Sequence, residues 1–539
     1  MRPEVPGIDA ATLSIVGHNL VAICEEMAAT LVRSAHSSIV REGKDCSTAL
    51  LDPDGRVVAQ SQSIPIQLGS IAIVSEHMFR TLSVDDMGPD EFLLTNDPYS
   101  QCQHLNDLVI LSPVHYQGAL VAWSGAIIHL IDIGGGAPST QTNATDIFGE
   151  GLRIPSMRAS LADLEPGGWL YVILSANVRA PDEVIGDIRA QLAATARGRD
   201  RFLALLDRYG EPIVRECAIA MQDYAESMVQ HAIDALPNGR FRGSDIIESD
   251  GVGGGPYTIA ADIVVEEGQL LIDLTGTDAA APGPVNSPLA STMSAIYSFV
   301  ANFMMSDSTF VNDGCYRPVH TVVPMGSLLN PAFPSPVLVR TNAANRLFSA
   351  LKLAYAEMDP AHSVACGQDH PCQYSLSRLH EGRYSMITGT TFGAWGASSI
   401  ADGENALSSH LSNGTNLPIE YEETISDWYR IEAYHLRTGS GGKGLYRGGM
   451  GLRRAYRILE DGGSFSAFSD RFSIQPWGLF GGEAGQTAAF TVIRNGESIE
   501  LSPLVTSLPL LRGDLLIIDT AGGGGWGQPE PLGESQPNS

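Results

Sequence analysis

The sequence of 539 residues predicts an α+β fold made of several parts, on three observations. Two long amphipathic helices follow residue 181, short strand patterns with turn dipeptides precede and follow them, and the last third is rich in glycine. A chain of this length is enough for roughly two to four domains. We expect an N-terminal metal-binding α/β part, a mixed middle domain, a strand- and glycine-rich C-terminal part and a disordered tail. The expected boundaries are 1–240, 241–384, 385–528 and 529–539.

The first part is expected to begin with a helix over residues 9–34, with Asp9 as its N-cap. The stretch "TALLDPDGRVVAQS" then predicts a strand, a "DPDG" turn and a second strand. Further strands are expected at 91–95, 108–115 and 119–128.

Two amphipathic helices are expected after Pro181, with a break at Gly210. The turn-rich stretch "PNGRFRGSDIIESDGVGGGPY" favours a domain boundary. Beyond it we expect a strand hairpin and then two helices, at 258–265, 269–274, 288–305 and 344–357.

Composition restricts the classes of partner. The formal net charge is −28, so the chain lacks the basic face that a nucleic acid or an anionic membrane surface would require. The seven cysteines form no Cys-x-x-Cys pair and are odd in number, which indicates reduced thiols. The N-terminus lacks the apolar core of a signal peptide, and no apolar run approaches the ~18–20 residues of a membrane span. We therefore expect a cytoplasmic protein that binds neither nucleic acid nor membrane.

Two His-x-x-Asp pairs flank one hairpin-sized segment. "NDPYSQCQHLNDLVI" places His104 three residues before Asp107, and "AIIHLIDIGGG" places His129 three residues before Asp132. The intervening strands meet at the turn dipeptide Gln117-Gly118, so paired residues should have numbers that sum to about 234–235. Asp107 would then face Ile127 or Ile128, His129 would face Leu105 or Asn106, and both pairs would lie at the open end of the hairpin.

Four donors at one hairpin end predict a divalent metal site. Two neutral imidazoles and two carboxylates suit zinc, manganese or ferrous iron. A metal with an open position lowers the pKa of bound water and polarises an oxygen of the substrate. Asp45, in "VREGKDCS" before a strand, is a further carboxylate. The alternative is that Asp107 and Asp132 only cap turns.

The remaining motifs do not predict a nucleotide-binding loop or a catalytic nucleophile. The Gly-x-Gly-x-x-Gly spacing of Gly439, Gly441 and Gly444 is followed by "LYRGGMG", which is not a helix, so a dinucleotide loop is not predicted there. The sequence contains no Gly-x-x-x-x-Gly-Lys-[Ser/Thr] motif and no Gly-x-Ser-x-Gly elbow. The short spacing of Cys366 and His370 has no catalytic signature. We expect the glycine-rich stretches to form tight turns and close backbone approaches.

Several stretches, in order, resemble the hydantoinase B / oxoprolinase family over nearly the whole chain. They are "SSIVREGKDCSTALLDPDGRVVAQSQSIPIQLGS", "LTNDPYSQCQHLNDLVILSPVHYQGALVAWSGAIIHLIDIGG", "PDEVIGDIRAQLAA", "RTNAANRL", "LRTGSGGKGLYRGGMGLRR", "QPWGLFGG" and "GDLLIIDTAGGGGWGQP".

The resemblance implies a B-type subunit of an ATP-dependent complex, a heterotetramer or larger, in which a hydantoinase A-type partner carries ATP and magnesium. Such complexes open cyclic amides or carboxylate ketones. The family's metal positions correspond to His104, Asp107, His129 and Asp132, with Asp45 as a weaker fifth. At Gln67, in "IPIQLGS", many relatives have His instead.

The resemblance favours an ATP-dependent hydrolase of hydantoins, 5-oxoproline or lactams. Its implied mechanism is attack by metal-bound hydroxide on substrate phosphorylated in the partner, with Asp107 and His129 as catalytic residues. The alternatives are a subunit of an acetone- or acetophenone-type carboxylase and a non-catalytic scaffold subunit.

Overall fold

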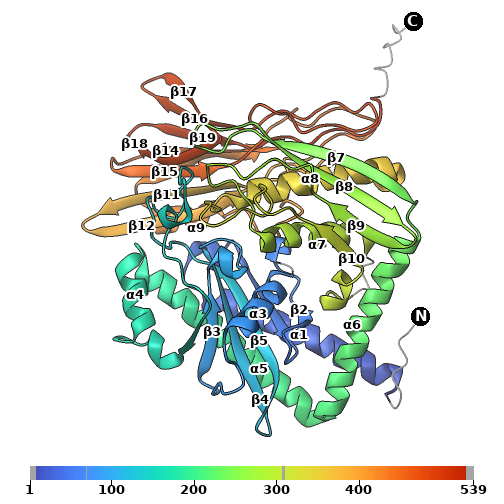
Figure 1. The fold of residues 1–539 in the computed structure, drawn as a ribbon. Coiled ribbons are helices and arrows are strands. Elements are labelled where there is room, and N and C mark those ends of the chain that lie inside the picture. Colours follow the sequence, from blue (N-terminus) through green and yellow to red (C-terminus); the bar gives the residue numbers. More distant parts are fainter. Residues whose placement is uncertain (1–7, 68, 306–309, 530–539) are drawn as a thin grey trace, which may run out of the picture.

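The computed structural model describes residues 8–67, 69–305 and 310–529. These residues form four sheets with helices packed on them, so the predicted α+β fold of several parts is confirmed. Figure 1 shows the N-terminal sheet and its helices below, the middle part above and to the right, and the C-terminal sheets at the top.

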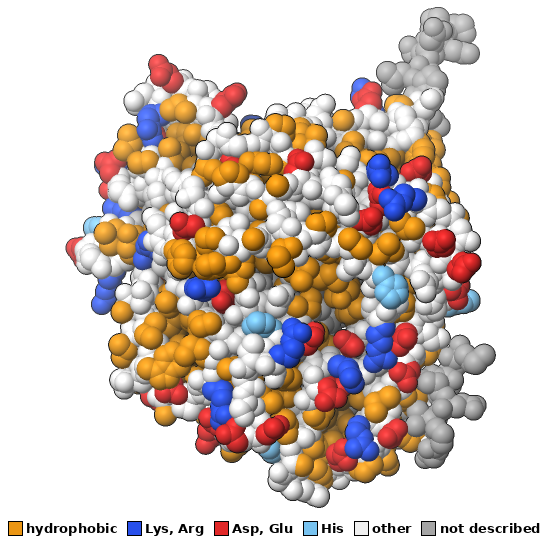
Figure 2. Space-filling model, in the orientation of Figure 1, with side chains coloured by type: hydrophobic (Ala, Val, Ile, Leu, Met, Phe, Trp, Pro, Cys, Tyr) orange, Lys and Arg blue, Asp and Glu red, His pale blue; other side chains and the backbone are white. Residues whose placement is uncertain are grey.

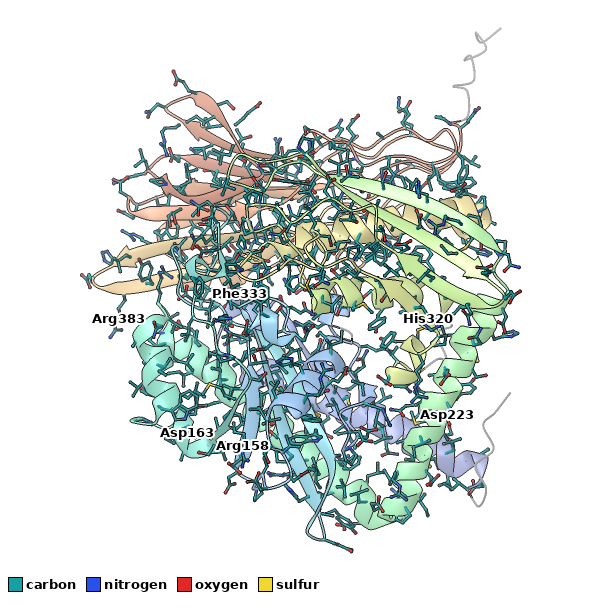
Figure 3. All side chains as sticks on the ribbon, viewed as in Figure 1. Arg158, Asp163, Asp223, His320, Phe333 and Arg383 are labelled. Carbon is teal, nitrogen blue, oxygen red and sulfur yellow. The ribbon has the colours of Figure 1, made fainter. Side chains whose placement is uncertain are left out.

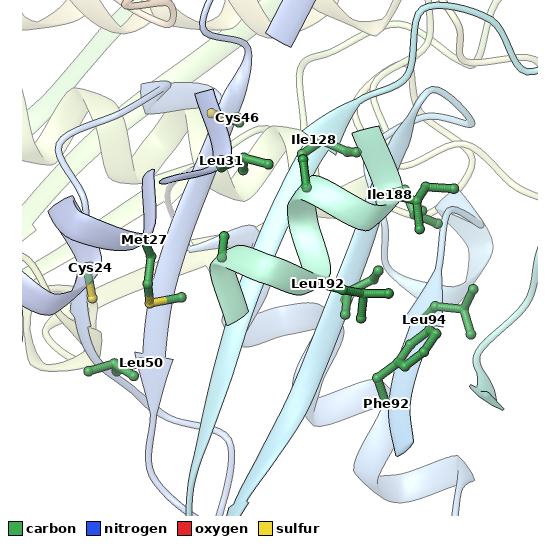
Figure 4. Packing of buried hydrophobic residues seen from close by; sticks show 14 of the residues in the cluster. Cys24, Met27, Leu31, Cys46, Leu50, Phe92, Leu94, Ile128, Ile188 and Leu192 are labelled. Atoms are coloured by element: carbon green, nitrogen blue, oxygen red, sulfur yellow. The ribbon is translucent and has the colours of Figure 1, made fainter. Parts of the chain in front are cut away.

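The first sheet has six antiparallel strands in the order β2-β1-β5-β4-β3-β6. Helices α1 (Ala10–Ser34) and α5 (Pro181–Tyr209) cover one face, and α3 (Ser70–Thr81) covers the other. Figure 4 shows Leu31 of α1 and Leu192 of α5 among the buried side chains between helices and sheet. The strands are β1 (Cys46–Leu51), β2 (Val57–Gln60), β3 (Glu91–Thr95), β4 (Asp107–Tyr116), β5 (Ala119–His129) and β6 (Met157–Ser160).

The long helices α1, α5 and α6 (Glu211–Asp234) of the first part follow the predicted pattern closely, whereas the shorter α2 (Ser38–Arg41), α3 and α4 (Trp169–Asn177) were not predicted. The Asp9 carboxylate accepts hydrogen bonds from the backbone N–H groups of Ala11 and Thr12, as an N-cap does. Gly210 separates α5 from α6, as expected. The first turn of α3 follows Gly69, which lies in the left-handed region at φ 71°.

Helix α1 corrects one expectation about membrane spans. Among the described residues it is the one helix that is long and apolar enough to cross a membrane. The structure uses it differently, because Leu20, Met27 and Leu31 are buried against α5 and the first sheet. A core helix on a sheet satisfies the same test of length and composition.

The middle part consists of a four-stranded sheet and two buried helices. Its order is β10-β9-β8-β7, with β10 parallel to β9 and the other pairs antiparallel. Helices α7 (Leu289–Met304) and α8 (Arg340–Met358) share its core. The strands are β7 (Gly239–Ile247), β8 (Tyr257–Glu266), β9 (Gln269–Asp273) and β10 (Val319–Val322).

The C-terminal part contains two antiparallel sheets whose inner faces share one apolar core. Phe465 of β15 packs edge to face against Phe490 of β16 on the other sheet. One sheet consists of β12 (Arg383–Thr391), β11 (Cys372–His380), β15 (Gly463–Phe468) and β18 (Leu504–Leu510). The other consists of β13 (Tyr429–Leu436), β14 (Leu452–Ile458), β19 (Leu515–Asp519), β16 (Ala489–Arg494) and β17 (Glu497–Leu501). Helix α9 (Ile419–Ile425) precedes β13.

Two of the expected domain boundaries can be compared with the positions of strands in the structure. Strand β7 begins at Gly239, next to the expected boundary at residue 240, whereas the boundary at residue 384 falls inside β12. The expected disordered tail, 529–539, lies outside the described residues apart from Pro529.

The glycine-rich stretches run side by side as extended backbone. The backbone N–H of Gly523 donates to Gly449, and the N–H of Gly442 donates to the carbonyl of Gly523. A Cβ on Gly523 would lie 1.9 Å from the carbonyl oxygen of Trp395, and one on Gly524 would lie 2.1 Å from that of Trp477. These positions exclude any side chain, as expected for close backbone approaches.

Candidate metal centre

A bulge in the β4–β5 hairpin sets the register of the site. At the turn, Tyr116 pairs with Ala119, but the register shifts between Val114 and His115. From there to the open end the pairing is displaced by one residue, so Asp107 pairs directly with His129. The expected partner of Asp107, Ile127 or Ile128, was therefore wrong by one to two residues, because the unbulged register does not persist along the strands.

Asp45 joins this end of the hairpin from the neighbouring strand. Cys46, the first residue of β1, pairs with Ile128 of β5. The carbonyl oxygen of Asp45 accepts a hydrogen bond of 3.1 Å from the N–H of His129. Its carboxylate oxygen Oδ1 accepts one of 3.0 Å from Nε2 of Gln67. The side chain of Gln67 therefore contacts a predicted residue of the site.

His104 completes a cluster of four predicted residues. Its Nε2 lies 3.2 Å from Oδ2 of Asp107, and its ring centroid lies 5.0 Å from that of His129. The three side chains are almost completely shielded from solvent. The structure thus brings Asp45, His104, Asp107 and His129 together.

Arg340 is a member of the cluster that the sequence reasoning missed. It is the first residue of α8, and its Nη2 donates 2.5 Å to Oδ2 of Asp107 and 2.8 Å to Oε1 of Gln103. Arg340 and Asp107 are 233 positions apart in the sequence. The available signal was the stretch "RTNAANRL", which begins at Arg340.

Asp132 lies in a different set of contacts. Its carboxylate accepts hydrogen bonds from the backbone N–H groups of Gly134, Ser139 and Arg179, and from Nη1 of Arg179. No contact of this carboxylate with the other four predicted residues is found in the described parts of the chain. The acceptors of Asp132 are used to fix the loop after β5.

The cluster contains an unusual number of buried atoms without partners. Both ring nitrogens of His104, both ring nitrogens of His129 and Oδ1 of Asp107 are buried and make no well-formed hydrogen bond. Buried polar atoms in proteins are nearly always paired, so atoms left unpaired in one place indicate an additional ligand. Imidazole nitrogens and carboxylate oxygens are donors that zinc, manganese and ferrous iron accept.

The side chains do not form a finished ligand shell. In residues 8–67, 69–305 and 310–529, no three His, Cys, Asp or Glu side chains are arranged to hold a metal ion. One oxygen of Asp107 is instead paired with Arg340. The donors thus fit a metal by their chemistry and burial, but their present arrangement does not form a ligand set.

The electrostatics of the cluster keep both histidines neutral. Burial, and then the charge of the neighbouring His104, lowers the pKa of His129 to about 3. Burial and the charge of Arg340 lower the pKa of His104. Burial opposes ionisation of Asp107, but Arg340 and the two histidines outweigh it and lower the pKa of that carboxyl. Burial, and then the charge of Asp107, raises the pKa of Asp45 to about 7. Neutral imidazoles beside an ionised carboxylate are in the protonation states that a metal requires.

The segments that carry His104 and Arg340 also meet near the surface. The hydroxyl of Tyr99 donates 2.6 Å to the carbonyl oxygen of Ser335, and the Tyr99 ring packs edge to face on Phe333. Figure 3 shows Phe333 at the junction between the N-terminal part and the parts above it. The cluster therefore belongs to the contact region between the first sheet and the middle part.

The cysteine–histidine alternative is not supported. The thiol of Cys366 lies 3.0 Å from Nη2 of Arg471, and Nε2 of His370 lies 3.2 Å from the hydroxyl of Thr341. Burial raises the pKa of Cys366 to about 12, so the thiol stays protonated. All seven cysteines are buried and unpaired, as expected for reduced thiols.

Basic residues do not gather on the surface in view. Figure 2 shows Lys and Arg side chains interspersed with Asp and Glu on that face. This distribution accords with the net charge of −28.

A family profile described as Hydantoinase B/oxoprolinase matches residues 9–529. The chain is 30% identical to the B subunit of a putative D-/L-hydantoinase from a Pseudomonas species, over 98% of this chain and 92% of that protein. It is 28% identical to the beta subunit of the caprolactamase of Pseudomonas jessenii, over 97% of this chain and 91% of that protein.

Two solved structures share the fold. The crystal structure of the ATP-dependent caprolactamase from Pseudomonas jessenii has a TM-score of 0.88 at 26% identity, over 98% of this chain and 93% of that one. Acetone carboxylase in a nucleotide-free state has a TM-score of 0.85 at 18% identity, over 96% of this chain and 76% of that one. The second likeness concerns the fold alone.

Proposed function

Because the chain belongs to the hydantoinase B/oxoprolinase family, we propose that it is the B-type subunit of an ATP-dependent enzyme that opens a cyclic amide. Its likeness to a hydantoinase subunit and a caprolactamase subunit favours a hydantoin or lactam as substrate. The observation that carries the proposal is the buried cluster of unpartnered imidazole nitrogens and carboxylate oxygen at the end of the β4–β5 hairpin.

We propose that Asp45, His104, Asp107 and His129 hold one zinc, manganese or ferrous ion. A metal held there would activate water and polarise the carbonyl oxygen of the substrate. The chain contributes neutral imidazoles, since burial lowers the pKa of His104 and His129, and an ionised carboxylate at Asp107. The rigid strand pairing of Asp107 with His129 fixes the spacing of the donors. Asp132 is left out of this ligand set, because its oxygens already accept four hydrogen bonds.

The proposal includes an A-type partner that binds ATP and magnesium. The relatives in question are named as the B or beta subunits of their enzymes, which accords with a partner chain. This sequence has no recognisable phosphate-binding loop of its own. In the proposed order, the partner phosphorylates the amide oxygen and so weakens amide resonance. Water then adds to the carbonyl carbon in this subunit, the C–N bond of the ring breaks and the ring nitrogen takes up a proton. The resulting acyl phosphate is hydrolysed by a second water to the carboxylate and inorganic phosphate. We place the complex, a heterotetramer or larger, in the cytoplasm.

A ketone carboxylase subunit is the second candidate. Its support is the fold shared with acetone carboxylase, at an identity of only 18%. The higher identity to the hydantoinase and caprolactamase subunits favours the hydrolase. A scaffold subunit is disfavoured, because a purely structural role gives no reason to keep several ligand-type atoms buried and unpaired.

The Asp107→Asn variant, purified in complex with the A-type partner, tests the function. An amide is a poorer metal ligand than a carboxylate, and a buried substitution leaves the outer surface of the subunit unchanged. ATP turnover by the partner should continue, whereas ring opening should fall by about 100-fold, so the two become uncoupled. ADP and ring-opened product are measured in parallel on hydantoin and caprolactam. Unchanged product formation by an intact Asp107→Asn complex would favour the scaffold.

A further inference from the structure

Arg340 is the one cation that directly contacts the acidic members of the cluster in the described structure. Its side chain is only 6% exposed. Two of its nitrogens are committed, since Nε and Nη2 donate to Gln103 and Nη2 also donates to Asp107. Nη1 makes no hydrogen bond to any described residue. The guanidinium therefore has N–H groups left to donate hydrogen bonds, next to the side-chain atoms proposed as metal ligands.

Charge counting shows what this guanidinium changes. Asp45 and Asp107 together supply two negative charges when both are ionised, and imidazoles that ligate a metal are neutral. A divalent ion would balance the two carboxylates and leave the cluster neutral. With Arg340 present, the same loaded cluster carries one net positive charge. In a site from which water is largely excluded, one unbalanced charge decides the sign of the preferred ligand.

We propose that Arg340 makes the metal-loaded site selective for an anionic ligand, which in the reaction is the substrate after phosphorylation. The inference rests on the proposed function. Arg340 acts here as a positioning and specificity residue: it holds the Asp107 carboxylate through Nη2 and offers the N–H groups of Nη1 to phosphoryl oxygens. A guanidinium suits this task, because it stays charged and its hydrogen bonds to an anion are charge-assisted. An unphosphorylated amide, which is neutral, gains nothing from the extra charge and is disfavoured.

The inference predicts opposite effects on cations and on anions. The positive charge of Arg340 opposes a metal ion and favours a phosphate. Arg340→Gln removes this charge but keeps a hydrogen-bond donor, so it should bind Mn²⁺ at least as tightly as the wild type. The same variant should bind inorganic phosphate roughly ten-fold or more weakly at the loaded site. Arg340→Lys keeps the charge and should retain most of the phosphate affinity.

The experiment uses the full chain in complex with its A-type partner. Mn²⁺ affinity is measured by isothermal titration calorimetry. Phosphate binding is measured by the paramagnetic broadening that bound Mn²⁺ causes in the ³¹P resonance of inorganic phosphate, with nucleotide omitted. Gln103→Leu is the matched control, since it removes the neutral acceptor of Arg340 and leaves the charge in place. It should affect phosphate binding less than Arg340→Gln does.

The outcomes separate this inference from the proposed function. Tighter or equal Mn²⁺ binding with weakened phosphate binding in Arg340→Gln supports the inference. Equal phosphate binding by Arg340→Gln and wild type overturns it while the metal site stands. Loss of Mn²⁺ from Arg340→Gln to the same extent as from His104→Ala also overturns it, because Arg340 would then support the ligands only. A wild-type complex without Mn²⁺, zinc or iron affinity overturns the proposed function and the inference together.

Discussion

Two buried polar clusters in this molecule differ in how completely their charges are paired. The site cluster, defined as Asp45, His104, Asp107, His129 and Arg340, contains two carboxylates and one cation. The ion-pair network consists of three carboxylates and three cations, Asp245, Asp369, Asp470, Arg346, Lys352 and Arg471.

The network joins three regions of the sequence. Nη1 of Arg471 donates 3.1 Å to Asp245 of β7, and Nζ of Lys352 in α8 donates 2.8 Å to Asp369. Asp369 also accepts from Ser349 and from the backbone N–H of Gly367. Burying charges costs less when each has an opposite partner, and every charge of the network has one, although Nε of Arg346, Oδ2 of Asp470 and Nε of Arg471 make no hydrogen bond. The site cluster keeps excess negative charge and unpaired imidazoles, which is the condition of a binding site.

The largest expected effect on stability comes from a substitution that breaks the ion-pair network. Asp245→Ala removes the shared partner of Arg346 and Arg471 and leaves two buried cations short of countercharge. We expect a loss of about 3–5 kcal/mol in the free energy of unfolding. Urea denaturation measures it. The metal content of the folded fraction should stay at the wild-type level. A surface substitution changes stability by less than about 1 kcal/mol, so a loss this small would show that the network does not stabilise the fold.

The converse effect is expected at the site cluster. His104→Ala and His129→Ala each remove a ligand atom and should weaken metal binding by about 100-fold. Elemental analysis of the purified proteins measures the metal. Asp45→Ala is expected to lose less metal, because the Asp45 carboxyl has a raised pKa and is protonated more easily than the Asp107 carboxyl. Equal metal content in wild type and both histidine variants would contradict the site assignment.

The pH dependence of metal binding sharpens the comparison. Burial and the Asp107 charge raise the pKa of Asp45 to about 7, so below that pH a metal has to displace a proton. Zinc affinity should rise roughly ten-fold per pH unit up to about pH 7 and then level off. The two histidines should contribute little, because their lowered pKa values keep them neutral in this range.

Stability of the metal-free chain should change in the opposite direction. A raised pKa means that the folded state holds the Asp45 proton more tightly than the unfolded state. The stabilisation is complete below the ordinary value of 3.8 and is lost as the pH rises to about 7.

Calorimetric zinc titrations from about pH 5.5 to 8 test the pH dependence of zinc affinity, and Asp45→Asn should flatten the profile. A profile that Asp45→Asn leaves unchanged would remove Asp45 from the ligand set.

The smallest effect is expected at Asp132. Its carboxylate fixes the loop after β5 through Arg179 and backbone N–H groups. Asp132→Asn should cost about 1–2 kcal/mol of stability and leave metal content unchanged. Thermal denaturation and elemental analysis on the same sample provide both readings. Loss of metal equal to that of His104→Ala would restore Asp132 as a ligand.

Local patterns made part of the site predictable. His104, Asp107 and His129 lie on one hairpin, so a turn dipeptide and strand alternation suffice to bring them together. The bulge that pairs Asp107 with His129 has no clear sequence signal.

Long-range contacts were not predictable in the same way. Arg340 reaches Asp107 only because α8 starts at the contact between two parts of the fold. Asp132 has the same local spacing as Asp107, but Gly134 turns the chain at φ 83° and backbone donors take its oxygens. Helix α3 was missed because its start after Gly69 lacks a side-chain cap.

The glycine-rich stretches of the C-terminal part determine the order in which parts of the chain can fold during synthesis on the ribosome. Gly523 and Gly524 thread between backbone segments near Trp395, Gly449 and Trp477, all made earlier. Until those last residues leave the exit tunnel, the earlier segments lack hydrogen-bond partners for their carbonyl and N–H groups. The first sheet and its β4–β5 hairpin, by contrast, are closed by pairings within the first 160 residues. Nascent chains stalled before residue 520 should therefore be protease-sensitive in the C-terminal part while the N-terminal sheet is already protected.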